Sequence, residues 1–179
     1  MAEENKEGWL NYLALSTVIF AVCATLATFK WGGFSTQSVM SQSQATDQWA
    51  YYQSKGIKTY LHQMQAEKMA IELLVLPKTT APEVLQLYKS KMADYKQRVE
   101  KYALEKAEIE ARAKQLEVIR DETQLHAYTF GIALIYLQIA ILLSSVAGLL
   151  KRKLVWYGGL LTGSIGLFYF ANGFLVVVK

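Results

Sequence analysis

The residue types that most often carry catalysis or bind metals are scarce in this chain. Its 179 residues include two histidines, His62 and His126, and one cysteine, Cys23. Metal sites and general-base sites need several such groups at defined spacing. His62 falls in a polar stretch and His126 at the edge of an apolar run, so we do not expect them to meet. No nucleophile, metal-ligand or phosphate-loop motif occurs. We therefore expect no enzyme activity, no catalytic residues, no metal site and no cofactor.

Three uncharged runs decide the class of protein. They lie between Glu7 and Lys30, between His126 and Lys151, and between Lys153 and Lys179, and have 22, 24 and 25 residues. A helix needs roughly 20 apolar residues to cross a bilayer, so each run is long enough to span. We expect the first run to be a retained signal anchor, because an acidic start and the lack of a small-residue cleavage site argue against a cleaved signal.

Composition agrees with this class and excludes another. The chain is 53% hydrophobic, and its net charge of +4 comes from basic residues interleaved with acidic ones. Nucleic-acid binding usually needs clustered Lys and Arg, so no such partner is expected. Cys23 lies within the first run, where a lone thiol is usually a small packing residue.

The polar block between the first two runs is expected to form a helical hairpin. We expect Gly32-Gly33 to break the first helix, and a loop over residues 77–82 to form the tip because it holds both prolines of the chain. Thr80-Ala81-Pro82-Glu83 fits a capping box, with Thr80 as the cap. The helix that starts there meets no Gly or Pro until Gly131, so we expect it to continue into the second run.

Each arm of this hairpin carries a series of positions at alternating steps of three and four, which is typical of a coiled coil. On the second arm the series is Tyr88, Met92, Tyr95, Val99, Tyr102, Lys106, Ile109, Ala113, Leu116 and Thr123. On the first arm it is Trp49, Gly56, Tyr60, Met64, Ile71 and Leu74. Equal helical rise on both arms pairs Met64 with Tyr95, Tyr60 with Val99, and Trp49 with Ile109.

The fold class that follows is an all-α membrane protein, with three transmembrane helices and a long extramembrane antiparallel helical hairpin. Residues 1–30 form the first transmembrane helix, 31–126 the hairpin, and 127–179 a transmembrane helical hairpin. Lys151-Arg152-Lys153 is a short basic loop, and such loops stay cytoplasmic. The N-terminus is then cytoplasmic, and the long hairpin and the C-terminus lie on the periplasmic side of a bacterial inner membrane.

The apolar runs offer packing and contact residues. Gln138 and Asn172 are the most polar groups at membrane depth, and we expect hydrogen bonds to other helices rather than a transport path. Gly159, Gly163 and Gly166 let helices approach closely, either within one chain or between subunits. Both alternatives remain open from the sequence. The aromatic group Trp49, Tyr51 and Tyr52 places rings on more than one helix face, and it is the best candidate for contact with a partner.

Two segments resemble a known family. They read NYLALSTVIFAVCATL over residues 11–26 and SQSQATDQWAYYQ over residues 41–53, the latter followed by Lys55 and Ile57. They are similar to an uncharacterised family of small bacterial membrane proteins, domain of unknown function 4337, over nearly the whole chain. The resemblance implies a bacterial source and the same order of span, hairpin and two spans. It implies no activity and no catalytic residues.

Two functions fit these observations. The first is a membrane-anchored coiled-coil scaffold or accessory subunit, which assembles with itself or with other membrane protein subunits. The second is a homo-oligomeric channel or transport component. Ionisable residues are absent from all three runs, although proton and ion relays usually need them. The expected partners are therefore membrane lipid and protein.

Overall fold

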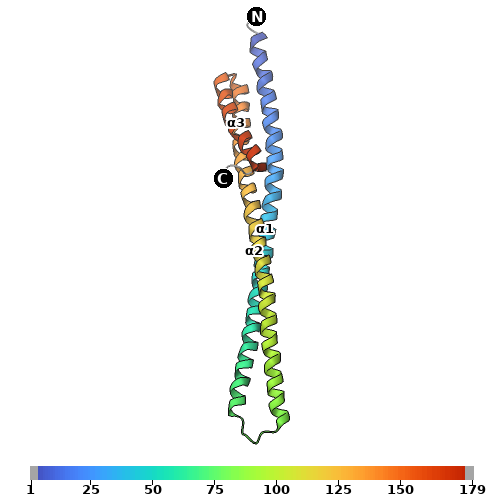
Figure 1. Cartoon of the computed structure of the whole chain (residues 1–179). Helices are drawn as coiled ribbons and strands as arrows, with labels where there is room; N and C mark the ends of the chain where they lie inside the picture. Colours follow the sequence, from blue (N-terminus) through green and yellow to red (C-terminus); the bar gives the residue numbers. More distant parts are fainter. Residues whose placement is uncertain (1–3, 176–179) are drawn as a thin grey trace. The chain divides into compact units, whose positions relative to one another are not determined.

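All regular structure in the described part of the chain is α-helical. The computed structural model describes residues 4–175, with side chains from Gly8 to Leu175. Three helices follow one another, α1 (Glu4–Val75), α2 (Pro82–Leu150) and α3 (Lys153–Leu175) (Figure 1). Each contains a stretch long and apolar enough to cross a membrane. The predicted all-α class is thus confirmed for these residues. The C-terminal end, which the sequence interpretation placed on the periplasmic side, lies outside the described residues.

The helices contribute to two compact units. The apolar unit contains residues up to Met40 together with those from Ile119 onward, and the hairpin unit contains Ser41–Val118. The boundaries expected from the sequence, after residues 30 and 126, followed the ends of the uncharged runs. The compact units instead divide ten residues later on α1 and eight residues earlier on α2. The apolar unit therefore includes more polar chain than the uncharged runs alone.

The break expected at Gly32-Gly33 is wrong, because α1 continues through both glycines. Glycine costs a helix interior about 1 kcal/mol relative to alanine, and neighbouring contacts offset this. The Phe34 ring stacks on His126 of α2 at 4.8 Å between ring centroids. The Trp31 side chain lies within 4 Å of the Cβ position of Gly131. Contacts on both sides of the glycine pair thus hold α1 against α2.

Replacing Gly32 and Gly33 by alanine should stabilise the protein. A Cβ at either position meets no atom within 4 Å, and both glycines lie inside a helix. Each substitution is expected to raise the free energy of unfolding by about 0.5–1 kcal/mol. Denaturant titration of the detergent-solubilised protein measures this change. A loss of stability in both variants would show that the chain needs a non-helical conformation at these glycines.

The loop between α1 and α2 corrects the expected capping box. α2 begins at Pro82, and the Leu85 amide donates to the Ala81 carbonyl at 3.3 Å. Ala81 is therefore the N-cap residue and Pro82 occupies the first helical position, where its missing N–H is not needed. The Thr80 hydroxyl donates instead to the Pro77 carbonyl at 2.6 Å. Thr80 thus closes the loop and does not cap the helix.

The hairpin unit pairs the two arms in antiparallel order, with α1 and α2 side by side up to the loop (Figure 1). On the α2 arm, every position of the expected series is buried or half-buried. Ala113, Thr123 and Ile109 are the most enclosed, at 0%, 6% and 8% exposed. The face that α2 turns toward α1 therefore follows the sequence prediction.

The α1 arm departs from the prediction. Tyr60, Met64, Ile71 and Leu74 were expected in the interface, but they are 63%, 48%, 64% and 86% exposed. The enclosed series is Ser41, Ala45, Gln48, Tyr52, Lys55, Thr59, His62, Ala66, Met69 and Leu73. Small side chains such as Ala45 and Ala66 let the helices approach, and long polar ones reach partners on α2. The side of this arm with small and polar residues is therefore the one that packs.

One contact departs from the expected pairing of the two arms. The Trp49 indole N–H donates to the Glu117 carboxylate at 2.9 Å, about two turns beyond the predicted partner Ile109. Nearer the loop, His62 lies between the rings of Tyr95 and Tyr102, each 5.6 Å away between centroids. Farther from the loop than His62, the Lys106 ammonium lies over the Tyr52 ring, as equal advance along both arms predicts. The Trp49–Glu117 contact therefore reflects the reach of two long side chains.

The apolar unit packs α1, α2 and α3 around small residues. Phe20 and Ala24 of α1 meet Leu137 and Ala140 of α2, and Leu160 and Leu167 of α3 pack against them. α3 runs antiparallel to α2, because Gly159 lies beside Ser144, Gly166 beside Leu137 and Gly173 beside Phe130. The turn between them has Lys151 at φ 53°, and the Arg152 amide donates to the Ala147 carbonyl at 3.2 Å. This bond is the outer one of a Schellman motif.

Candidate functional site

The three glycines predicted as contact residues are used within the chain. Gly159, Gly163 and Gly166 are all buried in α3. A Cβ on Gly163 would lie 2.2 Å from Cζ of Phe20 on α1, and one on Gly166 would lie 2.9 Å from Cγ of Leu137 on α2. Of the two alternatives that the sequence left open, the structure shows packing within one chain. These glycines therefore offer no exposed surface to a second subunit.

The polar residues of the apolar segments divide into two groups. Asn172 is 6% exposed and Ser144 is fully buried. The Ser144 hydroxyl has no hydrogen-bond partner among the described residues, and it lies 3.2 Å from the Cβ position of Gly159. Gln138, in contrast, is exposed on α2. Of the two predicted intramembrane polar residues, Asn172 therefore lies inside the chain and Gln138 lies on its surface.

The aromatic group Trp49, Tyr51 and Tyr52 belongs mainly to the inside of the hairpin. Trp49 and Tyr52 are half-buried and meet edge to face at 5.5 Å between centroids. The Lys106 ammonium of α2 lies 4.4 Å from the Tyr52 ring centroid. Only Tyr51 is substantially exposed, at 48%. Two of the three rings are therefore occupied by α2, which leaves Tyr51 as the member that a partner can reach.

An ion pair links the two arms close to these rings. The Lys55 ammonium is bonded to the Glu105 carboxylate, and the two side chains are 12% and 31% exposed. The Lys55 ammonium also lies 4.7 Å from the Tyr102 ring centroid. The hydrogen bond to Glu105 raises the pKa of Lys55, and the bond to Lys55 lowers the pKa of Glu105. The pair stabilises the hairpin at neutral pH, and this contribution is lost as Glu105 protonates in acid or as Lys55 deprotonates in strong alkali.

Each histidine has partners of its own. His62 lies between two tyrosine rings of the hairpin unit. In the apolar unit, Nδ1 of His126 lies 2.8 Å from the Gly173 carbonyl oxygen of α3, and its ring stacks on Phe34. No cluster of three metal-ligating side chains occurs among the described residues. Both histidines therefore contribute to packing between helices in this structure.

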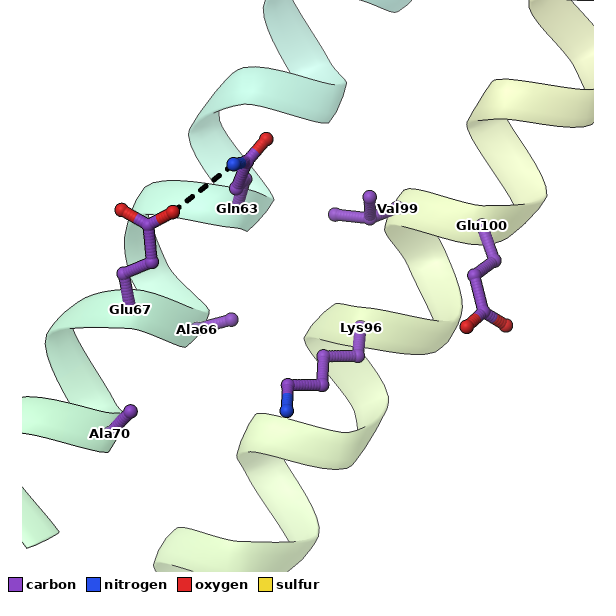
Figure 2. A pocket seen from close by; sticks show the side chains of 7 residues that line it. All are labelled: Gln63, Ala66, Glu67, Ala70, Lys96, Val99 and Glu100. Carbon is purple, nitrogen blue, oxygen red and sulfur yellow. Dashed lines mark hydrogen bonds between the residues drawn. The ribbon is translucent and has the colours of Figure 1, made fainter.

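A cavity of about 370 Å³ lies between the arms of the hairpin unit. Figure 2 shows Ala66 and Ala70 on the α1 side, with Lys96 and Val99 directed toward them from α2. The Glu100 side chain turns away on the far side of α2 (Figure 2). The two alanines leave this space because their side chains are short. Its lining combines the apolar side chains of the two alanines and Val99 with the Lys96 ammonium, two carboxylates and the Gln63 amide.

The opposite side of the α1 arm carries large apolar side chains that the chain leaves uncovered. We call it the outer apolar face, and its side chains are 48–86% exposed. They are Ile57, Tyr60, Leu61, Met64, Ile71, Leu74 and Val75. A shallow depression of about 310 Å³ lies on it between Met64 and Ile71, edged by Glu67, Lys68 and Glu72. An exposed apolar face with a charged rim is typical of a protein-binding surface.

A family model described as a domain of unknown function (DUF4337) matches residues 9–176. The chain belongs to this family. No curated protein and no solved structure matches it. The DUF4337 match includes α1 from Trp9 onward, all of α2 and α3, the outer apolar face and Gln138.

A sequence signal for the outer apolar face exists in this DUF4337 chain. Ile57, Leu61, Met64, Ile71 and Val75 lie at alternating steps of four and three, with Lys68 completing the series. This series is offset by two residues from the enclosed series, which places it on the opposite side of the helix. None of the six positions expected on the first arm belongs to the enclosed series, whereas Met64 and Ile71 belong to the outer one. A helix with two such faces can pack on two neighbours at once.

Proposed function

We propose that this chain is a non-enzymatic, membrane-anchored scaffold or accessory subunit that docks a partner through the outer apolar face. The apolar segments of α1, α2 and α3 would cross a bacterial inner membrane, with the N-terminus in the cytoplasm and the hairpin in the periplasm. The basic residues Lys151 and Arg152 between α2 and α3, with Lys153 at the start of α3, support this orientation. The partner is a second copy or another membrane protein subunit.

The outer apolar face is the observation that carries this proposal. Seven large apolar side chains of the α1 arm are exposed, whereas the side of this arm that faces α2 is built mainly from small and polar residues. Water-exposed apolar area of this kind is unfavourable at about 25 cal/mol per Å², and a two-helix hairpin gains limited stability from its own packing. Docking a partner on this face would bury the exposed apolar area and add packing that stabilises the hairpin. In this proposal the hairpin is an antiparallel coiled coil that packs on both sides of α1.

The channel alternative is favoured by one residue. Gln138 faces outward from α2, where copies of the chain could place it around a common axis. Ser144 and Asn172, polar residues that a channel would also have to turn toward such an axis, are buried inside the chain. A pore lined by several polar residues from each chain therefore has less support than a scaffold.

The decisive experiment is the mass of the gently solubilised native particle, with its component chains identified. We expect an oligomer or a complex with other chains. The double substitution Ile71→Glu with Leu74→Glu should weaken its association at least tenfold, because it places two carboxylates on the docking face. Both residues are exposed, so the hairpin should still form.

A matched control adds the same charge to the far side of the other arm. On α2, Gln86→Glu with Gln97→Glu changes two exposed polar residues, and it should leave the particle mass unchanged. A wild-type particle that contains one chain alone would contradict the proposal. Equal effects of the two double substitutions would contradict the assignment of the docking face.

A further inference from the structure

The outward side of α2 in the apolar unit differs from those of α1 and α3. The outward sides of α1 and α3 carry exposed apolar side chains. They are Leu15, Val18, Val22 and Leu26 on α1, and Leu154, Leu161 and Phe168 on α3. On α2, Tyr128, Ile135, Leu142 and Leu149 are 58–83% exposed. Gln138 and Ser145, both exposed, alternate with them at steps of three and four. We call these six residues the Gln138 face.

Hydrogen bonding separates Gln138 from the other exposed polar residues. The hydroxyls of Thr25, Ser145 and Ser164 each donate to the carbonyl four residues earlier, at 2.9 Å. They are thus satisfied within their own helices. The side-chain amide of Gln138 has no hydrogen-bond partner among the described residues. Its amide has two N–H donors and one carbonyl acceptor, and lipid chains can satisfy none of them.

We propose that α2 of a second copy packs on the Gln138 face, with the two Gln138 side-chain amides hydrogen-bonded to each other. Two copies inserted in one membrane have the same orientation, so a twofold axis along the membrane normal brings residues of the same number together. A glutamine amide is complementary to itself under this symmetry, because each group donates one N–H and accepts one.

The rest of the face fits this pairing. Alternating steps of three and four match helices that cross at about 20°. Ser145, one heptad from Gln138, is small and allows close approach. Ile135 and Leu142 flank Gln138 and would exclude lipid from the amides. This inference rests on the proposed membrane anchorage, and it names a second copy as the partner within the membrane.

Cysteine cross-linking in native membranes tests the pairing while keeping the amide. The single cysteine is first removed by Cys23→Ser, and Ser145→Cys or Leu142→Cys is then added on the Gln138 face. The control is Leu161→Cys, which is 69% exposed on α3. We expect disulfide-linked dimers to form at least tenfold faster from the two α2 positions than from the α3 control. Equal rates at all three positions would reflect random collision and would overturn the proposal.

Gln138 is then changed in the Ser145→Cys background. Gln138→Leu removes the amide, and Gln138→Asn keeps it on a shorter side chain. We expect Gln138→Leu to lower dimer formation about three- to tenfold, and Gln138→Asn to retain more of it. An unchanged yield with Gln138→Leu would refute the amide contact.

Retention in membranes after an alkaline wash is measured on the same samples. Loss of retention contradicts the proposed membrane anchorage, and with it this pairing. Retention without cross-linking at residues 142 and 145 contradicts the pairing alone. The two failures are therefore distinguishable.

Discussion

Gly163→Ala is expected to lower the free energy of unfolding by about 1–3 kcal/mol, the range for overpacking a close-packed core. The added Cβ would lie 2.2 Å from Cζ and 2.6 Å from Cε1 of Phe20, far inside van der Waals contact. The Phe20 ring is 4% exposed and packs among Ala24, Leu137 and Ala140, so it has no free space into which to rotate. The helices must separate instead. Thermal and denaturant unfolding of the solubilised protein measure the loss.

Two comparisons make this prediction specific. Gly158→Ala, five residues earlier on α3, meets no atom within 4 Å and should be neutral or stabilising. Phe20→Ala removes the obstructing ring, so adding Gly163→Ala to it should cost little. The coupling energy in this double-mutant cycle is then close to the cost of Gly163→Ala alone. A destabilisation by Gly163→Ala that persists without the Phe20 ring would refute the contact.

Phe130→Ala should cost about 3 kcal/mol of unfolding free energy, at the lower end for a buried aromatic residue. Phe130 is fully buried and touches all three helices. Its ring lies 6.0 Å from Phe34 on α1, and 6.0 Å and 5.1 Å from Phe170 and Phe174 on α3, centroid to centroid. If lipid surrounds this unit, the lost energy is mainly packing rather than transfer from water. The melting temperature of the solubilised protein should fall accordingly.

Phe168→Ala is the matched control for this substitution. It removes the same ring from a position that is 57% exposed on α3, and its effect should stay below about 1 kcal/mol. Equal melting temperatures for the Phe130→Ala and Phe168→Ala variants would contradict the role of Phe130 in joining the three helices.

The sequence predicted those parts of the fold that depend on length and on the periodicity of large apolar residues. The uncharged runs identified the apolar segments, and the spacing from Tyr88 to Thr123 identified the inner face of the α2 arm. Gly32-Gly33 was misleading, because single-residue propensity was weighed without the Phe34–His126 stack that holds the helix. Such contacts join residues distant in the sequence and cannot be deduced from local pattern.

The candidate site was harder to predict for a different reason. Tyr60, Met64, Ile71 and Leu74 were assigned to the interface because large apolar residues usually pack inside. Here the arms are held by Ala45, Ala66 and the Lys55–Glu105 pair. The outer apolar face was present in the sequence as a second series, but only the structure shows which of the two series is left uncovered.

Because the inner and outer sides of the α1 arm are held by different forces, added salt should affect them in opposite ways. Its inner side depends partly on the Lys55–Glu105 attraction, which added salt screens because both groups are partly exposed. Its outer apolar face gains from the same addition when the salt is strongly hydrated, such as sulfate, because such salts strengthen the burial of apolar surface. Rising sulfate concentration should thus weaken the ion pair between the arms while tightening the attachment of the outer face to a partner, and dilution should do the reverse.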